Sequence, residues 1–104
     1  MSEVANAVRG EASLVVDGRA LVLRPSFSAL VAAEGELGPL FALVERAGNG
    51  QLALHEIATL FWHCLTPSGC VTRDAVGEAV LAQGLAASAR PLRVLLGQIL
   101  QGTG

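Results

Sequence analysis

Residues 11–24 have the sequence EASLVVDGRALVLR, and this stretch decides how the fold begins. Asp17-Gly18 separates two runs that are rich in Val and Leu. An Asp-Gly pair in this setting predicts a two-residue type I′ turn, because both central residues of that turn need a positive φ. The resulting antiparallel hairpin places Glu11 beside Arg24 on one face, where an ion pair between them would contribute little to stability. Its other face is apolar and is expected in the core: Ala12, Leu14, Val16, Leu21 and Leu23.

A short first helix is predicted directly after the hairpin. Pro25 ends the second strand, and Ser26 is a good N-cap. Apolar residues follow at the i, i+3 and i+4 positions from Phe27, which is the spacing of one helix face. We expect Gly35 and Gly38 to close this helix, so it should be short.

Two further helices follow in the middle of the sequence. The second begins at Pro39 and stops at Gly48-Asn49-Gly50, with one apolar stripe between these points. The third covers about residues 54–65 and is the most hydrophobic segment of the chain. A helix that is apolar nearly all round usually lies at the centre of its domain.

The last part of the sequence predicts a fourth and a fifth helix. Thr72 is the expected N-cap of the fourth helix, and Gly84 is expected to end it. Asp74 lies in its first turn, where the helix dipole favours a negative charge. In the fifth, Ser88 is the expected cap, because Pro91 then lies in the first turn, where proline costs little.

The sequence therefore predicts an α+β fold: an N-terminal two-stranded antiparallel β-hairpin followed by four or five short packed helices. The length of 104 residues fits one domain with a real core. Residues 1–9 show no useful periodicity, so we expect a flexible N-terminal tail before a single domain of residues 10–104.

The composition is rich in apolar residues and low in charge. Hydrophobic residues make up 52% and charged residues 15%, against about a quarter charged in ordinary soluble domains. Either Ala and Gly inflate the apolar count, or apolar surface is kept for a partner or for self-association. The net charge is −2, and the seven basic residues, all Arg, are scattered among acids. They form no basic stripe for a phosphate backbone, so we expect no binding to nucleic acid.

No membrane or export signal is expected. The longest uncharged run contains Pro67 and Gly69, and its apolar part is about half of the ~20 residues that a membrane span needs. The N-terminus has Glu3 before its first Arg and no continuous apolar stretch, unlike a signal peptide. We therefore expect a bacterial cytoplasmic protein with no membrane partner.

Two patterns resemble metal sites but lack the necessary ligands. Glu45–Glu56 has the length of a calcium loop, with Gly50 at its sixth position, but its third position is Ala47, which offers no side-chain oxygen. A zinc site built from His55, His63, Cys64 and Cys70 would lack any C-x-x-C pair. No G-x-S-x-G elbow or phosphate loop occurs either. We predict no catalytic, cofactor-binding or metal-binding residues, and therefore no enzyme.

The most specific stretch of the sequence is LRPSFSAL, residues 23–30, placed directly after the hairpin. In this position, and with the order of helices and breaks behind it, the chain resembles a small gene transfer agent and phage tail protein family. That family is grouped with tail assembly chaperones and sometimes labelled tail tube proteins. The resemblance covers roughly residues 10–100, and it departs at Ala33-Glu34-Gly35, where an acidic residue often continues the first helix.

The resemblance implies a non-enzymatic role in tail assembly, with the tape-measure or tail-tube protein as the partner. Two alternatives remain: a minor structural tail subunit that forms a homo-oligomer in the particle, and a small regulatory or calcium-responsive module built on Glu45–Glu56. The candidate partner-binding residues are Trp62, Arg24 and Phe27. Trp62 lies off the main stripe of its helix and is the leading candidate for an anchor. Helical spacing itself predicts core positions for Phe27, Phe41 and Phe61.

Overall fold

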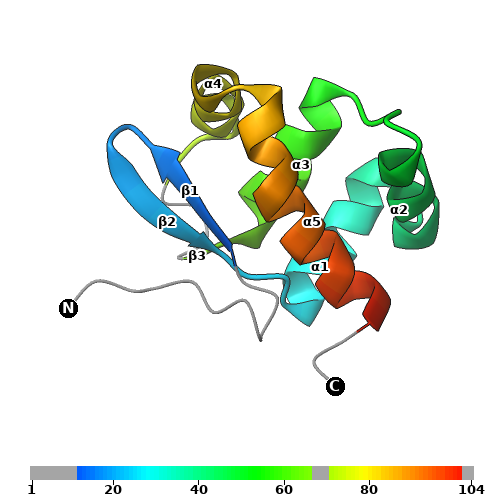
Figure 1. Cartoon of the computed structure of the whole chain (residues 1–104). Helices are drawn as coiled ribbons and strands as arrows, with labels where there is room; N and C mark the ends of the chain where they lie inside the picture. Colours follow the sequence, from blue (N-terminus) through cyan, green and yellow to red (C-terminus); the bar gives the residue numbers. More distant parts are fainter. Residues whose placement is uncertain (1–11, 67–70, 102–104) are drawn as a thin grey trace.

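A computed structural model describes residues 12–66 and 71–101 of the chain, and Figure 1 shows their arrangement. The predicted α+β class is confirmed: a hairpin is followed by five helices, with a short third strand between them. The expected tail of residues 1–9 lies outside the described residues. The elements are β1 (Ala12–Val16), β2 (Arg19–Leu23), α1 (Phe27–Leu37), α2 (Leu40–Gly48), α3 (Leu54–Cys64), β3 (Leu65–Thr66), α4 (Arg73–Gln83) and α5 (Leu85–Gln101).

The hairpin has the predicted register and the predicted buried face. Leu14 pairs with Leu21, and the turn residues Asp17 and Gly18 have φ values of 52° and 78°. All five residues of the predicted core face are buried. Glu11 lies outside the described residues, so its predicted pairing with Arg24 is not tested.

The sequence did not predict the third strand. Residues Leu65–Thr66 pair antiparallel with β2, which gives the sheet the order β1-β2-β3. A two-residue strand is too short to show any alternation of apolar and polar residues, so the sequence carries no pattern for it. The pairing joins the end of α3 directly to the hairpin.

Helix α1 is longer than predicted. Its N-cap is the predicted Ser26, whose Oγ accepts a hydrogen bond from the Ala29 N–H at 3.2 Å. The helix then continues through Gly35 and ends before Gly38, which has a φ of 85°. The prediction that Gly35 closes the helix was wrong, because one glycine costs only about 1 kcal/mol in a helix interior.

Phe27 and Phe41 are not core residues, contrary to the prediction from their spacing. Phe27 is 85% exposed and Phe41 is 73% exposed. Ala33 is the buried residue of α1, and Leu43 is the buried residue of α2. Both helices have apolar residues on more than one side, so the apolar spacing alone did not fix which side faces inward.

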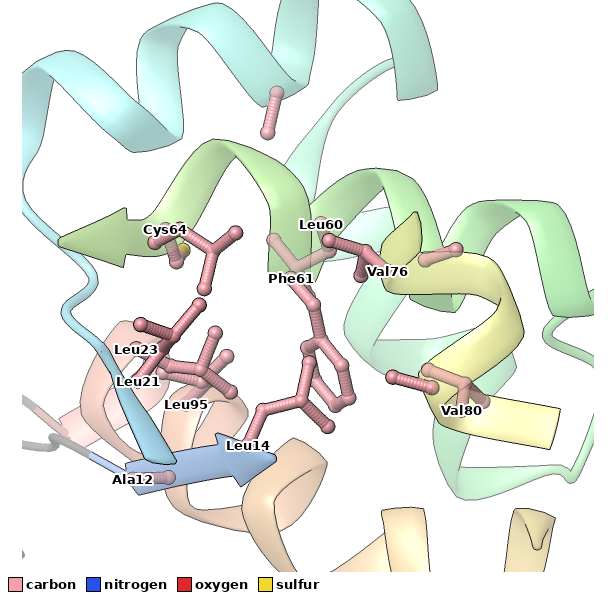
Figure 2. Close-up of a cluster of buried hydrophobic side chains, with 14 of the residues drawn as sticks. Ala12, Leu14, Leu21, Leu23, Leu60, Phe61, Cys64, Val76, Val80 and Leu95 are labelled. Carbon is pink, nitrogen blue, oxygen red and sulfur yellow. The ribbon is translucent and has the colours of Figure 1, made fainter. Parts of the chain in front are cut away.

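Helix α3 is central, as predicted, and packs against α1, α4 and β2. Phe61, in the second half of this helix, is fully buried. Figure 2 shows the Phe61 ring between Leu14 of β1 and the Val76 and Val80 side chains of α4. The same core includes Leu95 of α5, which lies beside the hairpin residues Leu21 and Leu23 in Figure 2.

Helix α4 has its predicted boundaries, whereas α5 begins earlier than predicted. Residue Leu85 already belongs to α5, and Pro91 lies inside the helix. The Ser88 N–H and the Ser88 Oγ both donate to the Gly84 carbonyl oxygen at 3.1 Å. These bonds place Ser88 within a helical turn, so it is not the N-cap that the sequence suggested. In Figure 1, α5 lies between the hairpin on the left and α2 on the right.

Within the described residues, no single helix has both the length and the apolar character needed to cross a bilayer. Helices α1 and α2 taken together pass that test on length and composition, but they are bent by 76° at the break between them.

Candidate functional site

Arg24 and Phe27 lie where the hairpin leads into α1. The Arg24 N–H donates to the Cys64 carbonyl oxygen at 2.7 Å, which fixes this junction against the end of α3. Arg24 lines a groove of about 440 Å³ between α1, the end of α3 and β3. Phe27 does not line this groove and projects from the first turn of α1. The groove is lined by Arg24, Ser26, Ser28, Ala29, Ala32, His63, Cys64, Leu65 and Thr66.

Trp62 is partly buried and held by its neighbours. The indole Nε1–H donates to the Val71 carbonyl oxygen at 3.1 Å. The guanidinium carbon of Arg73 lies 4.4 Å from the centroid of the indole ring, in a cation–π contact. A partner that used Trp62 as an anchor would therefore meet the Arg73 side chain over the ring.

Glu36 joins three helices at the surface beside Trp62. Its carboxylate accepts from Arg73 Nη2 at 3.0 Å and is also hydrogen-bonded to His63 Nε2. These partners, Arg73 first and His63 second, lower the pKa of Glu36 below its usual range. No pattern in the sequence indicates this cluster, because its members lie on α1, α3 and α4.

The segment with the length of a calcium loop contains an ion pair. Arg46 Nη1 and Nη2 donate to the two oxygens of the buried Glu56 carboxylate at 2.9 and 2.6 Å. The Ala53 N–H also donates to Glu56 Oε1, at 2.9 Å. These hydrogen bonds, Arg46 first, lower the pKa of Glu56. The carboxylate that would be the last ligand of the loop thus joins α2 to the start of α3.

The residues considered for zinc do not form a cluster in the described ranges 12–66 and 71–101, where no three His, Cys, Asp or Glu side chains gather. Cys70 lies outside these ranges. Cys64 is a free and buried cysteine, and burial raises the pKa of its thiol to about 12. Its thiol therefore stays protonated near neutral pH.

An apolar groove runs between α2 and α5, and we call it the α2–α5 groove. It consists of two hollows of about 210 and 440 Å³ that share Ala47, Ala89 and Leu92. Leu85 and Leu100, at its two ends, are each more than half exposed. Arg93 is its only charged lining residue among those described. Its lining is Val44, Ala47, Gly48, Gly50, Leu52, Ile57, Leu85, Ser88, Ala89, Leu92, Arg93, Leu96, Gly97 and Leu100.

The sequence missed this groove, although it contained part of the signal. Leu92, Leu95, Leu96 and Ile99 have the spacing of one helix face, and the structure buries only Leu95 and Leu96 of these four. The earlier start of α5 at Leu85 extends the apolar surface by a further turn.

The structure thus describes a small α+β protein with apolar surface between its helices, and comparison with protein families identifies it as a phage tail-related protein. The chain belongs to the family described as "Phage tail tube protein, GTA-gp10", whose model matches residues 9–102. This confirms the resemblance to gene transfer agent and phage tail proteins. No curated protein and no solved structure matches the chain.

Proposed function

We propose that this chain is a tail assembly chaperone that binds the tape-measure or tail-tube protein of a phage-like particle before assembly. The observation that carries the proposal is the exposure of two phenylalanines, Phe27 at 85% and Phe41 at 73%. A phenylalanine side chain buries roughly 150–250 Å² when it packs, so each exposed ring leaves a large apolar area in contact with water. A bound partner protein would remove that area from water.

The mechanism would be the temporary cover of an aggregation-prone segment of another tail protein. Exposed apolar side chains of α1 and α2 would supply the contact energy, at roughly 25 cal/mol per Å² of apolar surface buried. The edge strand β1 offers a second type of contact, because a partner strand can add to an open sheet edge. Val15 on this strand is exposed.

A second candidate is a structural subunit of the tail that associates with copies of itself. The description of the family favours it, since the words "tail tube protein" name a component of the particle. The same exposed phenylalanines would then lie at contacts between subunits.

Co-expression tests the proposal. The chain is produced with the tape-measure protein and, separately, with the tail-tube protein, and size-exclusion chromatography then shows whether a soluble complex forms. We expect a complex with one of the two, and a variant with Phe27→Ala and Phe41→Ala should reduce its yield. Leu81→Ala is a suitable control, because Leu81 is an exposed apolar residue on α4.

If neither tail protein forms a complex, the chaperone proposal is wrong. Detection of the chain in purified, mature particles at the level of a tail component would favour the structural subunit.

A further inference from the structure

We propose that the α2–α5 groove binds one amphipathic helix with acidic flanks, contributed by the partner tail protein. The inference rests on the proposed function, since it assigns the partner's binding element to a particular surface of this chain. Amphipathic helices commonly bind other proteins by placing an apolar stripe in an apolar groove.

The size of the groove fits a helix. Its lining extends along α5 from Leu85 to Leu100. At 1.5 Å per residue this is roughly 22 Å, the length of a helix of about 15 residues. On the opposite wall, Val44, Ala47 and Gly48 come from α2. A helix with Leu at the i, i+3, i+4 and i+7 positions presents a stripe of matching length.

Gly97 keeps part of the groove open. It lies inside α5, where glycine is a poorer helix former than alanine. A Cβ atom added at Gly97 would meet nothing within 4 Å, so the core does not require glycine there. A larger side chain at this position would instead occupy space in the groove, where the partner helix is expected.

The charge on α5 determines the chemistry of the partner. Helix α5 has no acidic residue, and its Arg93 lines the groove, although the net charge of the whole chain is −2. Among the described side chains, no carboxylate lies within ion-pair distance of Arg93. A helix whose Leu stripe is flanked by Glu would pair with Arg93 as it entered the groove.

The hollow between α3 and α4 does not offer the same selectivity. Its volume is about 370 Å³, and its rim carries Arg73, Asp74 and Glu78, which have charges of both signs. Such a rim favours neither an acidic nor a basic partner. The proposal is therefore limited to the α2–α5 groove.

A labelled peptide of about 15 residues, with a Leu stripe flanked by Glu, is the probe, and a second peptide carries Lys in place of Glu. Fluorescence anisotropy measures the binding of each peptide to the full chain. We expect the acidic peptide to bind more tightly than the basic one. Arg93→Glu should weaken binding of the acidic peptide about tenfold and strengthen that of the basic peptide. Arg19→Glu on β2 is the control and should change neither affinity.

A matched pair of glycine variants tests the place of binding. Gly97→Leu should weaken binding of the acidic peptide by at least about tenfold, because its side chain fills the groove. Gly35→Leu adds the same side chain to an open position on α1 and should leave binding within about twofold of the original. Equal affinities for the two variants, with both folded by circular dichroism, would overturn the proposal.

Co-expression separates failure of this inference from failure of the proposed function. If a tail protein forms a complex equally well with the Gly97→Leu and original chains, the proposed function holds and the groove is not its site. If sedimentation shows that the chain is a dimer and that Gly97→Leu makes it monomeric, the groove is occupied by a second copy, and the inference is wrong.

Discussion

Phe61 on α3 and Phe41 on α2 belong to two sides of the molecule that are built differently. Phe61 is fully buried between β1 and α4, whereas Phe41 is 73% exposed. Helix α3 has neighbours on several sides: α1, α4 and β2. Helix α2 packs against α1 and α5, and Leu43 is its only buried residue. The comparison shows that an aromatic residue at helical spacing is buried only where enough neighbouring elements surround its helix.

The largest expected effect is the difference in the free energy of unfolding between a substitution at Phe61 and one at Phe41. Phe61→Ala should lower the free energy of unfolding by about 3–5 kcal/mol, because it leaves a cavity in the core. Phe41→Ala should change it by less than about 0.5 kcal/mol, because the ring has few contacts to lose. Urea denaturation of both variants measures the difference. Similar losses of stability in the two variants would show that α2 is packed as tightly as α3.

A second test of the side built around α3 and Phe61 uses the Cys64 thiol. Burial raises its pKa from 9.0 to about 12, so above pH 9 the unfolded chain loses this proton while the folded chain keeps it. Stability should be unaffected below pH 9 and fall by about 1.4 kcal/mol per pH unit between pH 9 and 12.

The control for this test is Cys64→Ala, which retains every other titrating group. The difference in slope between the original chain and this variant, from denaturation at several pH values, isolates the thiol. An identical slope in both proteins would mean that water reaches Cys64 in the folded state.

On the side formed by α2 and α5, Gly97→Ala should increase the stability of the protein slightly. Replacing a helix-interior glycine by alanine gains about 0.5–1 kcal/mol when no atom is in the way, and no atom lies within 4 Å of the added Cβ. A small rise in the melting temperature is the expected result. A loss of stability would instead show that α2 and α5 pack closely at Gly97.

The smallest effect concerns the surface cluster around Trp62. Glu36 holds Arg73 over the indole ring, and its pKa is lowered chiefly by Arg73. The stabilisation from this carboxylate is present above pH 4.5 and is lost as the pH falls through the lowered folded pKa. Trp62 fluorescence should therefore show a transition below pH 4.5, and Glu36→Gln should remove that transition. A transition of the same size in the Gln variant would assign it to another group.

The sequence predicted those parts of the fold that have a local cause. The Asp17-Gly18 turn, the Ser26 and Thr72 caps and the Gly84 stop each depend on a few neighbouring residues, and the structure confirms them. Residues far apart in the chain decide the rest. The pairing of β3 with β2 and the Glu36–Arg73 contact have no local pattern, so sequence reasoning missed both.

The candidate site was predicted less completely than the fold. Of the three proposed contact residues, Phe27 is largely exposed, Arg24 lines a groove, and Trp62 is partly covered by Arg73. Their role in binding stays a prediction. The α2–α5 groove could not be predicted, because its walls come from two helices that the sequence separates by some 40 residues. The expectation of a role in tail assembly came from the family resemblance and not from the spacing of residues.

Hydrogen–deuterium exchange on the complex with the partner tail protein tests most directly whether the α2–α5 side is the open, partner-binding side. We expect binding to slow exchange in Leu40–Gly48 and Leu85–Gln101 and to leave the amides of Arg73–Gln83, which contributes no residue to the groove, unchanged. Slower exchange in Leu54–Cys64 and Arg73–Gln83, with Leu40–Gly48 and Leu85–Gln101 unchanged, would contradict this expectation.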